Sequence, residues 1–173
     1  MRQTARLLLA LTAVLSVVAA GPVVATETSV PGPTAPPGPA PSVAPQTGYL
    51  PIASWQLLAE VNTYRRSKGL VALKVDAGLA SAARAWSERM VARNVLSHND
   101  ALFTTASRDR LGMRALGENV GYNTSVLAQH RAFMASPGHR MNLDYAAFRS
   151  AGFAVVRDSR GWLWTTEDFG TPR

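Results

Sequence analysis

The stretch AGFAVVRDSRGWLWTT, residues 151–166, decides the fold class. Two runs rich in β-branched and aromatic side chains, 151–156 and 161–166, meet at a polar turn sequence, 158–161. This pattern predicts two antiparallel strands joined as a hairpin. Trp162 and Trp164 would share one face of the second strand, because side chains two residues apart in a strand point the same way.

Helical patterns precede the hairpin, with apolar residues recurring every three to four positions. The expected helices cover about residues 54–68, 76–93 and 124–135, with N-caps at Ser54, Asp76 and Thr124 or Ser125. The expected helix ends are Gly69, Asn94 and Pro137 with Gly138. Residues 107–123 contain glycines at three positions and are expected to be irregular. Helices first and strands last indicate an α+β fold.

The N-terminus has the pattern of an export signal. Residues 1–25 are predicted to be a signal peptide, because arginines precede an uncharged run, 7–20, and small residues follow it. Cleavage is expected after Ala20 or Ala25. An uncleaved anchor is the alternative, and it would be the protein's only attachment to a membrane. The protein is therefore expected to be secreted or associated with the cell envelope.

Composition narrows the classes of partner. Residues 26–51 are rich in proline and are expected to form a disordered linker, which leaves 52–173 as one folded domain. The absence of cysteine excludes disulfides, thiolate metal sites and iron–sulfur clusters. The formal net charge of +7 favours attraction to an anionic cell-envelope polymer. No stretch interleaves basic and aromatic residues, so no nucleic-acid partner is predicted.

Three histidines are available for chemistry. His98 lies 20 residues before Glu118, and His139 lies 21 residues after it. This spacing is not that of a self-contained metal motif. His130 lies in the third expected helix between polar neighbours and is expected at the surface.

Several blocks spread along the chain carry a family resemblance. They are Asn62, Arg65, Gly69 with Leu70, and Leu73; Ser97 with His98; Gly117-Glu118-Asn119-Val120; the block SPGHRMNL at 136–143; Gly152-Phe153-Ala154; and Phe169 with Gly170. Over about residues 54–170 the chain resembles the bacterial branch of the CAP superfamily. Other members include cysteine-rich secretory proteins, antigen 5 and plant pathogenesis-related proteins. The resemblance implies an α-β-α sandwich with three main helices around a small antiparallel sheet.

The resemblance also implies a site. In the family, two histidines and two acidic residues line a central cavity, and the histidines bind zinc in some members. Matching positions place His98, Glu118 and His139 in this ligand cavity, with Ser136 where animal members carry the second carboxylate. The supporting residues would be Ser97, Asn119, Arg140 and Asn142.

The metal chemistry agrees with the resemblance in part. Neutral imidazoles and a carboxylate suit Zn²⁺, so His98 and His139 would be the metal ligands. Glu118 would be a third ligand, would orient a histidine or would hold backbone amides of a glycine-rich turn. Because one carboxylate of the family set is missing, weak metal binding is expected. Glu167 or Asp168 would restore a carboxylate if its side chain points inward.

Three functions are compatible with these residues. The leading one is a non-enzymatic binding module for a small amphipathic or cell-envelope ligand, a class that the resemblance implies. The alternative is a zinc-dependent hydrolase, in which Glu118 is the candidate catalytic residue and acts as general base on zinc-bound water. The second alternative is a structural envelope or stress protein with a vestigial site.

Overall fold

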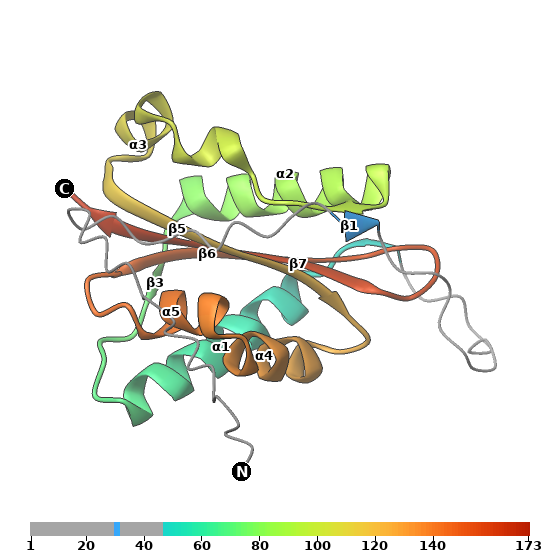
Figure 1. The fold of residues 1–173 in the computed structure, drawn as a ribbon, viewed down its shortest axis with the longest axis horizontal. Helices are drawn as coiled ribbons and strands as arrows, with labels where there is room; N and C mark the ends of the chain where they lie inside the picture. Colours follow the sequence, from blue (N-terminus) through green and yellow to red (C-terminus); the bar gives the residue numbers. More distant parts are fainter. Residues whose placement is uncertain (1–29, 32–46) are drawn as a thin grey trace, which may run out of the picture.

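Helices lie on both faces of a central sheet (Figure 1). The computed structural model describes residues 30–31 and 47–173. The helices on one face of the sheet are α2 (Ala77–Arg93) and α3 (Thr105–Leu111), with the 3-10 helix η1 (Asp100–Phe103) before α3. Those on the other face are α1 (Pro51–Ser67), α4 (Val126–Ala135) and α5 (Pro137–Asp144). The predicted α-β-α sandwich is therefore confirmed.

The main sheet has five strands in the order β2-β6-β7-β5, with β3 also paired to β6. Their bounds are Gly48–Tyr49 (β2), Lys74–Val75 (β3), Met113–Asn123 (β5), Ser150–Arg157 (β6) and Leu163–Pro172 (β7). All pairs are antiparallel except β3 with β6. A separate antiparallel pair joins β1 (Val30–Pro31) to β4 (Val95–Leu96).

The β6–β7 hairpin forms as the sequence predicts. The Asp158 carboxylate closes its turn by accepting hydrogen bonds from the backbone N–H of Arg160 at 2.9 Å and of Trp162 at 3.0 Å. Its second oxygen accepts from Trp164 Nε1 at 3.1 Å. Trp164 is fully buried, whereas Trp162 precedes β7 and is only half-buried. Trp164 is therefore a core residue.

Local caps fix two of the predicted helices. Asp76 accepts a hydrogen bond from the Leu79 amide at the start of α2, and Ser125 accepts one from Ala128 at the start of α4. Asn94 ends α2 in the left-handed conformation, with φ of 49°. Ser54 is not a cap, contrary to expectation, because α1 begins at Pro51.

The prediction that residues 107–123 are irregular is wrong, because they form most of α3 and all of β5. Gly112 ends α3 with φ of +66°. Gly117 and Gly121 lie inside β5 because helices pack directly on them. A Cβ would lie 2.7 Å from Asn142 Oδ1 at Gly117, and 2.4 Å from Gln129 Nε2 at Gly121.

The C-terminal ends of the last predicted helix and of the predicted linker also differ from expectation. Pro137 does end α4, but as the first residue of another helix, α5. Strand β2 and the first residue of α1 lie within the predicted linker, 26–51, so the folded part begins before residue 52. The predicted signal peptide, 1–25, lies outside the described residues. Within the residues that are described, no helix is both long and apolar enough to span a membrane.

Candidate functional site

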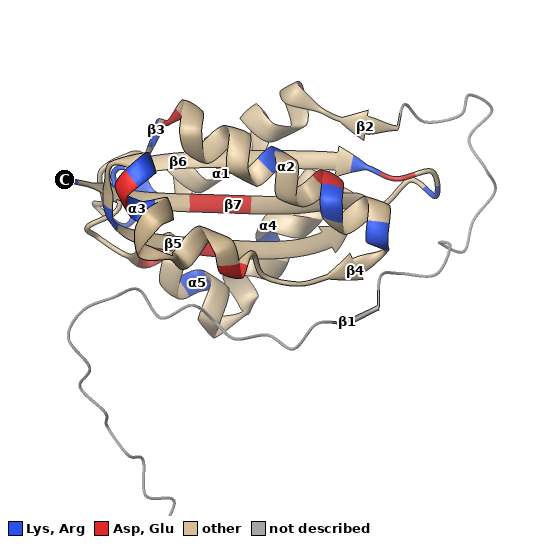
Figure 2. Ribbon diagram, turned by 90° about the horizontal axis from the view of Figure 1, so that it is seen from above, with Lys and Arg blue, Asp and Glu red and all other residues tan. Residues whose placement is uncertain are grey.

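The site residues meet at strand β5. Glu118 and Asn119 are consecutive in this strand, so their side chains point to opposite faces of the sheet. Both are fully buried. Figure 2 shows that acidic residues also occupy the middle of the neighbouring strand, β7. Two polar networks result, one on each face of the sheet.

On the α2 face, Glu118 binds the loop after β4. Its Oε1 atom accepts a hydrogen bond from the Asn99 amide at 2.9 Å and lies 2.7 Å from His98 Nδ1. The side chain of His98 is 7% exposed and that of Glu118 is 0% exposed. The neighbouring Ser97 accepts a hydrogen bond on its carbonyl oxygen from Trp86 Nε1. Glu118 thus contacts the first predicted histidine, but the backbone amide that it holds is that of Asn99 and not one of a glycine-rich turn.

Asp168 is the residue of β7 directly opposite Glu118 and is also fully buried. Burial, followed by the charge of Glu118 and a hydrogen bond with it, raises the pKa of Asp168 well above its usual range. A nearby like charge and a low-dielectric interior both disfavour the ionised form of a carboxyl group. Burial next to another carboxyl group therefore favours the protonated form of Asp168.

On the other face, Asn119 is the centre of the second network. Its Nδ2 atom donates to Glu167 Oε2 at 2.9 Å and to the backbone carbonyl of His139 at 3.2 Å. Asn142 Nδ2 donates to Asn119 Oδ1 at 2.9 Å and to the Glu118 carbonyl at 3.0 Å. Burial raises the pKa of Glu167 to about 8, although the bond from Asn119 acts against this shift. These bonds tie α5 to β5.

The remaining predicted residues lie around α5. His139 is 6% exposed, and its ring centroid is 4.8 Å from that of Phe133. Ser136 is half-buried at the start of α5 and makes no side-chain capping bond. Arg140 is exposed and reaches the Met134 carbonyl at 3.4 Å. The His139 ring packs on Phe133 of α4, and its backbone carbonyl accepts from Asn119 of β5, on the face opposite to Glu118 and His98.

The residues present do not fit a catalytic zinc site. Such a site needs three protein ligands and an open position. Among residues 30–31 and 47–173, no group of three or more histidine or acidic side chains is placed so that it could hold a metal ion. The three-ligand set of His98, Glu118 and His139 is therefore not formed in this structure.

The placement of His130 differs from the sequence-based expectation, and that of Glu167 and Asp168 adds to it. His130 is 5% exposed, not at the surface, because its face of α4 packs toward α1, and burial lowers its pKa. Its ring centroid is 6.4 Å from that of Tyr64. Glu167 and Asp168 both point inward, but to opposite faces, so each network gains one carboxylate.

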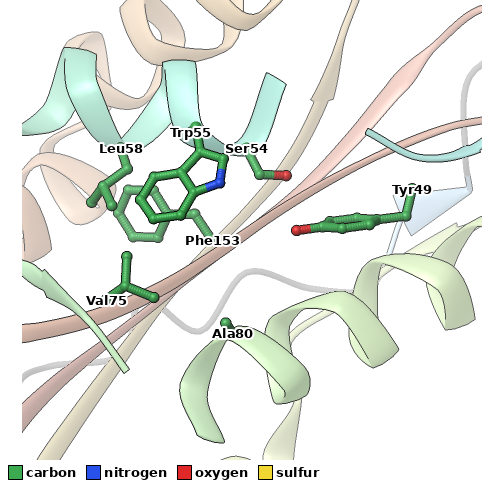
Figure 3. Close-up of a pocket in the computed structure, with 7 residues that line it drawn as sticks. All are labelled: Tyr49, Ser54, Trp55, Leu58, Val75, Ala80 and Phe153. Atoms are coloured by element: carbon green, nitrogen blue, oxygen red, sulfur yellow. The ribbon is translucent and has the colours of Figure 1, made fainter. Parts of the chain in front are cut away.

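An apolar pocket lies apart from both networks, at the edge of the sheet between α1 and α2 (Figure 3). Its lining residues are Tyr49, Ser54, Trp55, Leu58, Val75, Ala80 and Phe153. Trp55 covers it and remains 61% exposed, although it is a large hydrophobic residue. Sequence reasoning missed this pocket; the one available signal was a tryptophan among polar neighbours near the start of α1.

The pocket continues into a groove beside α1. Trp55, Leu58 and Val75 line both, and the groove adds Ala59, Asn62, Arg66, Leu73 and Lys74. Val75 is 46% exposed and Trp55 is 61% exposed. Exposed apolar residues that cluster in this way are typical of a binding surface.

Comparison with known proteins places these features in a family context. The model of the CAP family, described as the cysteine-rich secretory protein family, matches residues 58–169. The uncharacterized protein YkwD of Bacillus subtilis is 28% identical over 114 residues, which are 63% of this chain and 44% of that protein. The chain thus spans less than half of this relative.

Solved structures agree with this match. An extracellular protein of Bacillus anthracis that contains an SCP domain is 27% identical, with a TM-score of 0.58 over 68% of this chain and 40% of that one. An outer surface protein of Borrelia burgdorferi has a TM-score of 0.65 at 15% identity over 74% of this chain and 100% of that one. The second likeness concerns the fold alone.

Proposed function

Because the chain belongs to the CAP family, in its bacterial branch, we propose that it is a non-enzymatic, extracytoplasmic binding module for a small amphipathic ligand of the cell envelope. The predicted export signal supports this location, and the Bacillus anthracis relative is described as extracellular. The ligand site that we propose is the pocket under Trp55 together with its groove.

One observation carries this proposal: the pocket is apolar and open, and it continues into a groove whose lining includes two cations. Trp55 and Phe153 supply aromatic walls, and Arg66 and Lys74 line the groove. An amphiphile has an apolar part and a polar part, and this surface offers a partner for each. An aromatic wall that loses water when a ligand binds contributes strongly to the binding free energy, whereas exposed cations mainly orient the ligand.

The polar networks support a role other than catalysis. Glu118 has no exposed surface, and its Oε1 atom already binds His98 and a backbone amide. A general base must reach the proton that it removes, either directly or through one water. The observed bonds instead hold the loop after β4 and helix α5 against the sheet. This arrangement favours a structural role for the histidines and carboxylates over the hydrolase alternative.

The proposal is tested on protein purified from the exported fraction. Organic extraction followed by mass spectrometry is expected to recover an amphiphile in near-stoichiometric amount. The fluorescent probe N-phenyl-1-naphthylamine is expected to bind the stripped protein saturably and to be displaced by the extract. Absence of both a co-purifying amphiphile and saturable probe binding would contradict the proposal.

A further inference from the structure

The outer edge of strand β6 is covered at its two ends but open in the middle. Strand β3 pairs with Ser150 and Ala151, and strand β2 pairs with Val156 and Arg157. Between them, residues 152–154 have no neighbouring strand on this side among residues 30–31 and 47–173. The pocket under Trp55 lies at this opening, with Phe153 in its wall.

Backbone groups of Phe153 point into the opening. On one side of it, the Ala151 carbonyl accepts from Asp76 N at 2.9 Å across the same edge. On the other side, the Val155 carbonyl accepts from Leu50 N at 2.8 Å, and the Val155 amide donates to Ser54 Oγ at 3.0 Å. Alternate residues of a strand bond to the same side. Phe153 therefore directs its N–H and C=O to this edge.

No hydrogen bond of the residues that the structure describes reaches those two groups across the opening. Backbone N–H and C=O groups are strong, nearly always paired hydrogen-bonding groups, so an unpaired N–H and C=O beside an apolar pocket would provide a donor and an acceptor for a ligand. In an antiparallel pair, one residue of the partner satisfies both by exchanging two N–H···O bonds. The ligand chemistry that fits is a peptide residue.

The side chains around the opening specify that residue further. A residue directly opposite Phe153 would place its side chain on the same face as the Phe153 ring. That face carries Trp55 and Leu58, which cluster around the ring in Figure 3. An apolar side chain is therefore favoured.

Charge specifies the next residue. In an antiparallel arrangement the ligand runs toward the end of β6 that contains Ser150. Lys74 of β3 pairs in register with Ser150. Lys74 and Arg66 line the adjoining groove, whose lining residues include no carboxylate. The residue that follows the apolar one would lie opposite Gly152, next to Asp76, whose amide bonds to Ala151 on this edge. The Asp76 carboxylate caps α2, so an acidic side chain here is favoured where it turns toward Lys74 and Arg66.

We propose that this opening binds an extended peptide segment by adding it antiparallel to β6, with an apolar residue opposite Phe153 and an acidic residue toward Lys74. This inference rests on the proposed function, because both use the pocket under Trp55. It adds that the polar part of the ligand is a peptide amide. A plain alkyl chain would fill the apolar wall but would leave both Phe153 groups without a partner.

The test uses the exported protein labelled with ¹⁵N and the peptide acetyl-Ala-Leu-Asp-amide. Saturable binding is expected, with a downfield shift of the Phe153 amide as its hydrogen bond forms. N-methylation of the leucine removes the donor to the Phe153 carbonyl and is expected to weaken binding at least about tenfold. N-methylation of the aspartate is the matched control, since that N–H points away from β6, and it should change affinity less than about threefold.

Protein variants add a second check. Trp55→Ala is expected to weaken binding at least about fivefold, and Lys74→Gln by a smaller factor. Met141→Ala, a similarly exposed hydrophobic residue on α5, is expected to bind like wild type. The inference is overturned if the peptide does not bind, or if both N-methylated peptides bind equally well. If the wild-type protein binds N-phenyl-1-naphthylamine saturably but does not bind the peptide, only this inference is refuted. If it binds neither the probe nor the peptide, the proposed function is refuted as well.

Discussion

At the scale of single residues, the carboxyl group of Glu167 gives the molecule an unusual pH response. Its pKa rises to about 8 on folding because the side chain is fully buried. The folded state therefore holds this proton more tightly than the unfolded chain. The resulting stabilisation is fully present below about pH 4.5, the ordinary pKa of glutamate, and is lost as the pH rises through about 8.

Glu167→Gln is accordingly expected to remove this part of the pH dependence, because the amide is neutral throughout. The free energy of unfolding of the variant, measured relative to wild type, should therefore increase between pH 5 and pH 8 by an amount on the order of a few kcal/mol. Urea unfolding at three pH values measures the difference. His130, whose pKa is lowered by burial, opposes the trend, but it is present in both proteins and cancels.

The control for this variant is Glu88→Gln, which removes an exposed carboxylate on α2. Its stability relative to wild type should stay flat over the same pH range. If the Glu167→Gln and wild-type curves ran parallel, the buried carboxyl would have an ordinary pKa and this account of the second network would be wrong.

Asn142 is the residue that joins α5 to β5, through its bonds to the Glu118 carbonyl and to Asn119 Oδ1. Asn142→Ala leaves both buried acceptors without this donor, so a loss of about 2–3 kcal/mol in the free energy of unfolding is expected. The adjacent Met141→Ala, at a position 45% exposed, should stay within about 0.5 kcal/mol of wild type. Equal losses in the two variants on chemical unfolding would show that the bonds from Asn142 contribute nothing.

The histidines carry a further prediction at this scale. His98 and His139 contact opposite faces of β5, and no three-ligand group is formed in the part of the chain described. Isothermal titration with Zn²⁺ is therefore expected to give a dissociation constant in the micromolar range or weaker, unchanged by His139→Gln. A nanomolar site lost in that variant would mean that the two histidines bind one ion.

At the scale of elements, helix α2 lies directly on the backbone of β6. A Cβ at Gly152 would lie 2.0 Å from the Ala80 nitrogen and 2.0 Å from the Leu79 carbonyl carbon. Gly152→Ala must therefore displace a helix backbone and is expected to cost about 3 kcal/mol or more. Ser150→Ala, on the same strand, is the control and should have little effect. Thermal unfolding of both variants tests the packing, and a fully stable Gly152→Ala protein would refute it.

Elements with local signals were predictable from the sequence. Asp76 and Asn94 set the two ends of α2 through a cap and a left-handed residue, and both signals lie within the helix's own sequence. Strand β5 was not predictable in this way. Gly117 and Gly121 break the local strand pattern, and their reason is contact with α5 and α4, which are distant in sequence.

The site was predictable to the same degree. The contact between His98 and Glu118 follows the family resemblance, and a carboxylate from Glu167 or Asp168 is a conditional expectation from the sequence. Two features of the site could not be predicted from the sequence. The alternation of side chains in β5 separates Glu118 from Asn119, and it depends on a strand that the sequence did not predict. The pocket under Trp55 depends on where β2 and β3 end along β6.

At the scale of the whole molecule, the sandwich separates a closed polar interior from an open apolar edge. The carboxylates at the centre of the sheet are fully buried and bonded to elements of both layers. The surface under Trp55 lies instead at the edge where the layers meet, and its exposed residues take no part in those networks. We therefore propose that ligands bind at this edge and not among the histidines.

Fluorescence titration with N-phenyl-1-naphthylamine, run side by side on Trp55→Ala, His98→Gln and Met141→Ala, tests that claim most directly. Circular dichroism first establishes that each variant is folded. The account predicts that Trp55→Ala weakens probe binding at least about fivefold, while the other two variants bind like wild type. Unchanged binding by Trp55→Ala, together with loss of binding in folded His98→Gln, would contradict it and place the ligand among the histidines.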